Sequence, residues 1–260
     1  NNAGYWDKGE AVEKTVVFEE VPVTIEYHIV NATTHEVVET VDGGTFSVGT
    51  TLSLPDRTRL ERIGCTLSTK YYTDATCTAE VTTQQAGVTH YYIPYTVDSD
   101  ALLNTYHIVF STESDPVWHN VMVNNNKRIV FYNSTNSELP TSAYGPTELV
   151  NAETQWAFIG DPYSVKIINR ANPSKAATVA NGNNGTKVYL QDYDADHSRW
   201  CMRVGTTAGS LQLKVQGWGN DDYSAYWNAA GGSGSIQLYS KNEKYYSGSD
   251  NNIYVAYPPT

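Results

Sequence analysis

The chain has 260 residues and a formal net charge of −11, and it combines only 17% charged residues with 20 tyrosines and 6 tryptophans. Lysine and arginine total 17 and form no stripe, which excludes the positive surface that nucleic-acid binding or docking on an anionic membrane requires. No stretch has the apolar length of a transmembrane helix, which argues against membrane insertion, and the many aromatic and threonine residues favour an all-β fold.

The first 98 residues predict an extended lead-in, residues 1–20, followed by a small β-rich domain over residues 21–98. Apolar and polar residues alternate from Val23 to Val30, which is the period of two that a half-buried strand shows. Residues 56–63 are the local candidate for a short helix, because Pro55 precedes them in a position suited to helix entry. The predicted strands of this domain are 23–30, 36–41, 66–72, 77–81 and 90–97.

Three segments of this domain carry a resemblance to known proteins: "VTIEYHIV" at 23–30, "VGTTLSLP" at 48–55 and "YYIPYTV" at 91–97. Together they resemble the β-grasp or immunoglobulin-like stalk modules of bacterial surface proteins, including the mucin-binding-repeat type. The resemblance implies a secreted or cell-surface protein with an adhesive role. Since the chain begins at Asn1 rather than at methionine, we expect it to be part of a larger multidomain chain.

Residues 101–260 repeat one four-strand pattern three times. Each repeat opens with a strand, continues into a hairpin with an Asn- or Gly-rich turn, and closes on a strand rich in aromatic or apolar residues. The opening strands are 106–110, 163–168 and 210–215, and the closing strands are 156–159, 200–204 and 253–257. Four short strands repeated three times predict a β-trefoil, so the expected fold is all-β, with a small β-rich N-terminal domain before the trefoil.

The closing strands carry a second resemblance, to the ricin-type β-trefoil lectins, which place Gln-x-Trp near the last strand of each repeat. Here the equivalents read Thr154-Gln-Trp156 and Ser198-Arg-Trp200, while the third repeat has no tryptophan near 253–257. The resemblance implies carbohydrate binding, with a host or dietary glycan as the partner. Two alternatives stay open: a structural or adhesive spacer, and an inhibitor-like trefoil that binds proteins through the long insertion 133–152.

The densest cluster of sugar-binding residue types lies between Gly217 and Asn228, in the third repeat. A sugar site needs an aromatic platform for apolar C–H faces, beside amides and carboxylates for hydroxyl groups. Trp227 falls on a predicted strand and has the alternative interpretation of a core residue. Trp118 is a second candidate platform, in the first repeat. The candidate carbohydrate-binding residues are Trp218, Asn220, Asp221, Asp222, Tyr223, Trp227, Asn228 and Trp118.

Two cysteines allow a disulfide. Cys65 and Cys77 would pair if their segments were adjacent strands, because the bond needs Cα atoms within about 7 Å of each other. Spacing alone does not decide between this disulfide and two free thiols.

The chain has no strong catalytic or metal-binding motif. It lacks a Gly-x-Ser-x-Gly elbow and a His-Glu-x-x-His pair, and we find none of its 6 histidines at metal-ligand spacing. The run Asp192-Tyr-Asp-Ala-Asp196 resembles the start of a calcium loop, but its sixth and twelfth places are His197 and Arg203 instead of glycine and glutamate. We therefore expect no enzyme activity, metal or cofactor, and we interpret the run as a solvated turn or a sugar-contacting loop.

Overall fold

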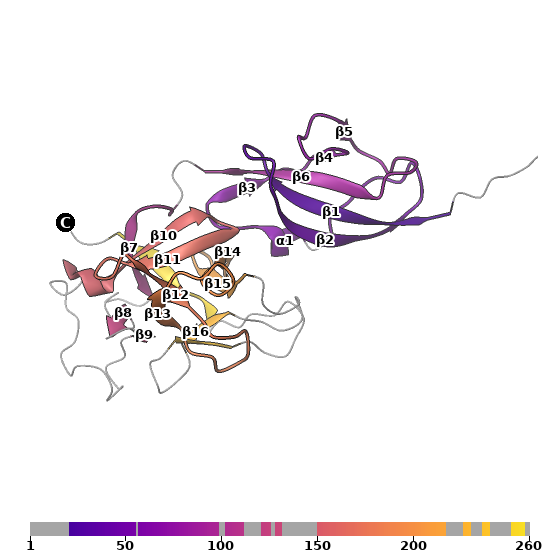
Figure 1. The fold of residues 1–260 in the computed structure, drawn as a ribbon. Coiled ribbons are helices and arrows are strands. Elements are labelled where there is room, and N and C mark those ends of the chain that lie inside the picture. The colour runs from indigo at the N-terminus through magenta and orange to yellow at the C-terminus, as the bar shows by residue number, and fades with distance from the viewer. Residues whose placement is uncertain are drawn as a thin grey trace, which may run out of the picture.

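The computed structural model describes residues 21–55, 57–98, 102–111, 121–125, 128–131, 150–216, 226–229, 236–239 and 251–257. These residues form two β-structures with separate sheets, an N-terminal unit (β1 to β6) and a C-terminal unit (β7 to β18), which lie against each other (Figure 1). The expectation of an all-β fold is confirmed. No helix in the described ranges has the length and apolar character needed to cross a membrane.

The N-terminal unit is one sheet with strand order β2-β1-β6-β4-β5, and β3 also pairs with β6. Its two central strands, β1 and β6, are parallel, so the chain between them must cross from one end of the sheet to the other. The elements are β1 (Val23–Asn31), β2 (Val37–Phe46), α1 (Arg57–Leu60), β3 (Cys65–Leu67), β4 (Tyr71–Tyr72), β5 (Glu80–Val81) and β6 (His90–Val97).

The alternation predicted for β1 decides which face of this sheet is buried. Ile25, Tyr27 and Ile29 point into a core that includes Tyr91 and Ile93 of β6, and all five side chains are fully buried. The residues between them along both strands therefore lie on the opposite face of the sheet.

The disulfide between Cys65 and Cys77 is not formed, and both residues are free thiols. Cys65 lies on β3 and pairs with Val97 of β6. Cys77 lies in the turn between β4 and β5, with φ at 54°, and its backbone N–H donates to the carbonyl of Asp74 at 3.1 Å. The predicted strand 77–81 is thus reduced to two residues, and the two cysteines are not on adjacent strands.

The described part of the C-terminal unit contains twelve strands and the short 3-10 turn η2 (Ala152–Thr154). Its strands are β7 (Tyr106–Phe110), β8 (Met122–Asn125), β9 (Arg128–Phe131), β10 (Gln155–Asp161), β11 (Ser164–Asn169), β12 (Lys175–Thr178), β13 (Tyr189–Asp192), β14 (Trp200–Val204), β15 (Leu211–Val215), β16 (Trp227–Ala229), β17 (Ile236–Leu238) and β18 (Tyr254–Ala256).

Six of these strands form a closed ring, in the order β15-β14-β11-β10-β7-β18. The ring closes where Leu211 and Ile253 exchange two backbone hydrogen bonds of 2.9 and 2.8 Å. The hairpins β8–β9, β12–β13 and β16–β17 contact one another, since β13 pairs with β9 and Lys187 forms a bridge to Gln237. A ring of six strands with three hairpins, one from each repeat, is a β-trefoil, and this prediction is confirmed.

Two tryptophans occupy equivalent positions in the first two repeats. Trp156 is the second residue of β10, which directly follows η2. Its indole N–H donates to the carbonyl of Met122 at 2.8 Å. Trp200 of β14 donates in the same way to the carbonyl of Ala177 at 3.0 Å. Each ring thus ties the last strand of its repeat to the second strand, and both side chains are fully buried.

The third repeat reverses this arrangement. Ile253 stands where the first two repeats have tryptophan, and Trp227 lies on the second strand, where they have Met122 and Ala177. Trp227 is fully buried and packs edge-on against Trp200, with ring centroids 5.2 Å apart. Asn228 is also buried. Trp227 thus belongs to the hydrophobic core, which is the alternative interpretation given for it above, and the carbohydrate-binding role of Trp227 and Asn228 stays a prediction that their burial disfavours.

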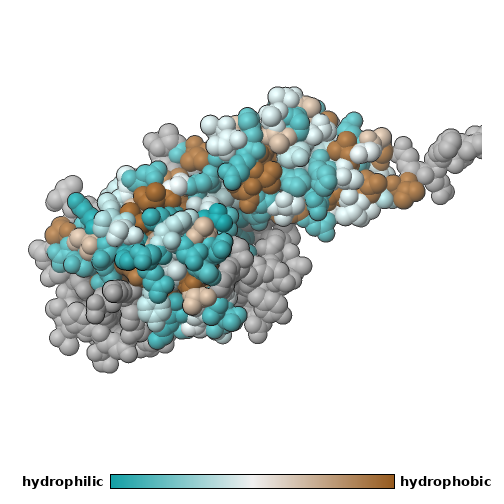
Figure 2. Space-filling model, viewed as in Figure 1, coloured by the Kyte–Doolittle hydropathy of each residue, from teal (hydrophilic) through white to brown (hydrophobic). Residues whose placement is uncertain are grey.

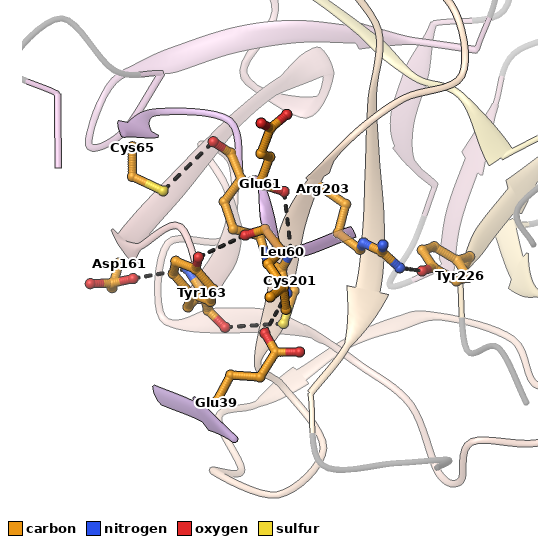
Figure 3. A network of polar contacts seen from close by, with 10 residues as sticks. Glu39, Leu60, Glu61, Cys65, Asp161, Tyr163, Cys201, Arg203 and Tyr226 are labelled. Carbon is orange, nitrogen blue, oxygen red and sulfur yellow. Dashed lines mark hydrogen bonds and ion pairs between the residues drawn. The ribbon is translucent and has the colours of Figure 1, made fainter. Parts of the chain in front are cut away.

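Arg62 joins the two units. Its guanidinium forms a 2.6 Å ion pair with Glu39 of β2 and lies 4.6 Å from the ring centroid of Tyr163, while its side chain is only 3% exposed. Tyr163 stands at the start of β11 and its hydroxyl donates to the carbonyl of Leu60 at 2.7 Å (Figure 3). Groups from both units thus surround one buried cation.

A second set of polar contacts lies beside this cation. The carboxylate of Asp161, at the end of β10, accepts hydrogen bonds from the hydroxyl of Tyr95 at 2.7 Å and from the amide of Asn31 at 3.1 Å. The backbone N–H of Ile63 also donates to the carbonyl of Met202 at 3.0 Å. Side chains therefore hold the N-terminal unit against the turn between the first two trefoil repeats, and a backbone bond holds it against β14.

The substitution Glu39→Gln should destabilise the protein by about 2 kcal/mol, because it leaves a buried guanidinium facing a neutral amide. Urea unfolding would measure the loss. Glu36→Gln, at an exposed glutamate on the same segment, is the control and should change the free energy of unfolding by less than about 0.5 kcal/mol. Equal effects of the two substitutions would show that the Arg62 ion pair contributes nothing to stability.

One buried histidine interrupts the apolar lining of the ring. His107 of β7 takes the position that Val165 and Leu211 hold in the other repeats. Its Nε2 lies 3.1 Å from the carbonyl of Leu102 and 2.9 Å from the hydroxyl of Thr105, while Nδ1 has no partner in the described part of the chain. Burial lowers the pKa of His107, so the folded state keeps the imidazole neutral.

Acid should weaken the fold through His107. Below about pH 6.5 the unfolded chain takes up a proton there that the folded state resists, so the free energy of unfolding falls by at most about 1.4 kcal/mol per pH unit. His107→Leu, which installs the residue of the third repeat, should reduce this slope in urea unfolding curves between about pH 7 and pH 5. Burial also lowers the pKa of His28, so only the difference between variant and parent reports on His107. An identical slope in both proteins would contradict the assignment.

Candidate functional site

Most of the residues predicted to bind carbohydrate lie outside the described residues. These are Trp118 in the first repeat and the third-repeat group Trp218, Asn220, Asp221, Asp222 and Tyr223. Their role stays a prediction. Trp227 and Asn228, the two members of the set that the structure describes, are both buried.

A pocket of about 530 Å³ lies on the second trefoil repeat, between the hairpin β12–β13 and the turn 192–198. This volume is within the range of small-ligand sites. Its apolar part comes from Val179, Ala180 and Leu190, and its polar part comes from Asn172, Lys175, Gln191, Asp192, Asp194 and His197. The pocket therefore offers amide, ammonium, carboxylate and imidazole groups beside a small aliphatic surface.

Asp194 organises the turn at the edge of this pocket. One carboxylate oxygen accepts a hydrogen bond from the backbone N–H of Asp196 at 2.9 Å, and the other lies 2.8 Å from Nδ1 of His197. The His197 contact and the backbone N–H bond lower the pKa of Asp194, so the carboxylate stays ionised near neutral pH. The imidazole is held in a fixed orientation by the same contact.

Asp192 is paired with a lysine of the neighbouring strand. Its carboxylate forms a 2.5 Å ion pair with Nζ of Lys175, the residue opposite it in the β12–β13 register, and this contact lowers the pKa of Asp192. Since Asp192 pairs with Lys175 and Asp194 with His197, the two aspartates do not converge on a shared cation. This arrangement supports the turn or sugar-contacting interpretation of the run over the calcium loop.

Ser198 explains why the Gln-x-Trp signature is altered here. Its hydroxyl lies 2.7 Å from that of Thr178 and accepts a hydrogen bond from the backbone N–H of Asp194 at 3.1 Å. The equivalent residues in the other repeats, Thr154 and Asn251, stand two places before Trp156 and Ile253 and are buried as well. Asn251 donates to the carbonyls of Trp227 and Tyr239 at 2.9 and 2.8 Å. In all three repeats this position is buried and hydrogen-bonded within the fold.

The sequence indicated only part of this pocket. The aspartate run was identified, but Lys175 and Asn172 were not, because they carry no motif. The repeat pattern contained the missing signal: a hairpin spanning 175–192 sets Lys175 opposite Asp192. Among the described residues, no tyrosine, tryptophan or phenylalanine lines the pocket. Tyr193, which is 46% exposed, borders a second, more polar pocket of about 510 Å³ between the two units, together with Glu36 and Arg199.

The described surface of the C-terminal unit is largely polar on the side seen in Figure 2. Figure 2 shows hydrophilic side chains predominating on the described part of the C-terminal unit in this view, with apolar residues in small separate groups. A face of this kind suits hydrogen-bonded recognition of a polar ligand more than the docking of an apolar partner.

No protein-family model matches the chain, and no curated protein matches it. Among solved structures, a designed threefold-symmetric protein, ThreeFoil, is 16% identical with a TM-score of 0.41, over 58% of this chain and 96% of that one. A ricin B-like lectin of Macrolepiota procera, in complex with lactose, is 12% identical with a TM-score of 0.43, over 60% and 97%. SeviL, bound to asialo-GM1 saccharide, is 14% identical with a TM-score of 0.37, over 58% and 96%.

Proposed function

We propose that the chain is a non-catalytic carbohydrate-binding part of a secreted or cell-surface protein, with the sugar held on the trefoil. The observation that carries this proposal is the pocket of the second repeat, where charged and amide groups surround a small aliphatic surface. Sugar hydroxyls pair with carboxylate, amide and imidazole groups, while C–H faces contact aliphatic carbon. A ligand with many hydroxyls and no charge fits such a mixed lining better than an apolar one does.

The hydrogen bonds around Asp194 support binding because its side chain needs little rearrangement when a ligand binds. His197 and the backbone N–H of Asp196 hold its carboxylate before any ligand arrives. Preorganised groups lose less entropy on binding than mobile ones. Since none of the described residues brings a tyrosine, tryptophan or phenylalanine to this pocket, we expect weak affinity for a single site. A longer chain with several modules would raise the affinity through multivalency.

The N-terminal unit fits the role of a stalk module. Its order β2-β1-β6-β4-β5, with the first and last strands parallel in the centre, is typical of the β-grasp arrangement. The polar contacts of Arg62 and Asp161 would hold the trefoil in a fixed orientation on such a stalk. We infer that the unit presents the trefoil away from an attachment point in a larger multidomain surface protein.

Trp218, Asn220, Asp221, Asp222 and Tyr223 form the second part of the proposal. Their residue types supply the aromatic platform that the pocket of the second repeat lacks, and Trp118 is the corresponding candidate in the first repeat. In this proposal the third repeat provides stacking and the second provides hydrogen bonds, at two separate sugar sites.

A glycan array probed with the whole chain tests the function, followed by titration of any hit. Asp194→Asn should weaken binding about tenfold, because a charge-assisted hydrogen bond is replaced by a neutral one. Asp74→Asn is the matched control: Asp74 also caps a turn through backbone N–H groups, at Thr78 and Ala79, but it lies in the N-terminal unit. The control should bind like the parent chain.

Three outcomes separate the parts of this proposal. A folded parent chain that binds no glycan would overturn the function and favour the spacer or protein-binding alternative. Binding that survives Asp194→Asn but is lost in Trp218→Ala would move the site to the third repeat. Equal losses in Asp194→Asn and Asp74→Asn would point to a general effect on folding instead of a pocket.

A further inference from the structure

Three side chains with metal-binding groups meet on the outer face of the N-terminal sheet. Glu26 and His28 are two residues apart on β1, so they project from the same face, opposite to the buried Ile25 and Tyr27. His90 begins β6 and is the direct parallel partner of Glu26. The central parallel pair of strands therefore brings together a carboxylate and two imidazoles that are distant in the sequence.

The spacing of their ligand atoms suits one small ion. Nε2 of His28 lies 3.2 Å from Nδ1 of His90, which lies 3.2 Å from Oε2 of Glu26, and the third side of the triangle is 3.8 Å. A tetrahedral zinc ion, with bonds of about 2.0–2.2 Å, holds neighbouring ligand atoms about 3.4 Å apart. The three ligand atoms therefore form a triangle close in size to one face of such a coordination tetrahedron.

Neighbouring residues hold the central ligand in position. The hydroxyl of Thr40 on β2 lies 2.9 Å from Nδ1 of His28, which directs Nε2 of the same ring toward Glu26 and His90. The ring of Tyr92 stacks on His28, with centroids 5.2 Å apart. A hydrogen bond to the second imidazole nitrogen is the usual way in which proteins orient a metal-binding histidine.

Exposure differs between the three ligands in a way that leaves one side open. The His28 side chain is 18% exposed, whereas those of Glu26 and His90 are 51% and 55% exposed. Asp42 lies opposite Glu26 in the β1–β2 register and adds a second carboxylate to this face of the sheet. Three protein ligands with an open fourth position for water or another ligand are typical of accessible zinc sites.

We propose that Glu26, His28 and His90 form a binding site for a divalent transition-metal ion of the zinc class. A bound ion fastens β1 to β6, the two central strands of the sheet, and presents one open coordination position to solvent. The sequence led us to expect no metal. Glu26 and His28 already have the same-face spacing of a strand, but the parallel pairing supplies His90 from 62 residues away.

The test uses the untagged chain, treated with a chelator and then titrated with zinc against a fluorescent zinc indicator. We expect one ion per chain and a rise in the melting temperature on binding. Each of Glu26→Gln, His28→Gln and His90→Gln should weaken zinc binding at least tenfold. Thr40→Val should weaken it about tenfold, while Thr40→Ser, which keeps the hydroxyl, should bind like the parent chain.

His35→Asn is the control. His35 is an exposed histidine of the same unit with φ at 60°, a conformation that asparagine tolerates, and it lies outside the cluster. This variant should bind zinc like the parent. Metal-free His90→Gln should melt close to the metal-free parent, which separates loss of the ligand from loss of the fold. No zinc binding by the parent chain, or unchanged binding by His90→Gln, would overturn the proposal and leave a hydrogen-bonded histidine pair.

Discussion

The buried guanidinium of Arg62 is the constraint on which the arrangement of the two units depends. A cation withdrawn from water is costly unless it has partners of good geometry, and Arg62 obtains them from both sides of the interface. Glu39 belongs to the N-terminal sheet and Tyr163 to the trefoil, so separating the units would strip the cation of one of them. Hydrophobic contacts alone would allow the units to slide against each other, whereas this set of directional contacts favours one relative placement of the two units.

Within the trefoil, the three repeats share one architecture but carry their large core side chains on different strands. Trp156 and Trp200 fill the interior from the last strand of their repeats, and Trp227 fills it from the second strand of its own. A well-packed core depends on the total volume of its side chains, and it matters less which strand supplies a large residue. A sequence signature based on the position of tryptophan can therefore be lost while the fold is kept. The surface loops can then carry different binding groups on the same fold.

The proposed sugar pocket and the proposed metal site obey the same rule of construction. In each, a polar residue on one strand meets a partner directly opposite it on the neighbouring strand: Lys175 with Asp192 in the trefoil, and Glu26 with His90 in the N-terminal sheet. Rigid strands place these groups more reproducibly than loops do. The two sites lie in different units, so either can be lost without the other.

The sequence by itself determined the fold class, because residue periodicity is a local property: alternation from 23 to 30 predicted a half-buried strand, and the threefold pattern after residue 101 predicted the trefoil. Only the tertiary structure decided which strands are neighbours. That choice buried Trp227, left Cys77 in a turn away from Cys65, and set His90 beside Glu26. A repeating pattern tells which face of a strand is buried. Parallel pairing and ring closure join residues remote in the chain, and no local pattern records them.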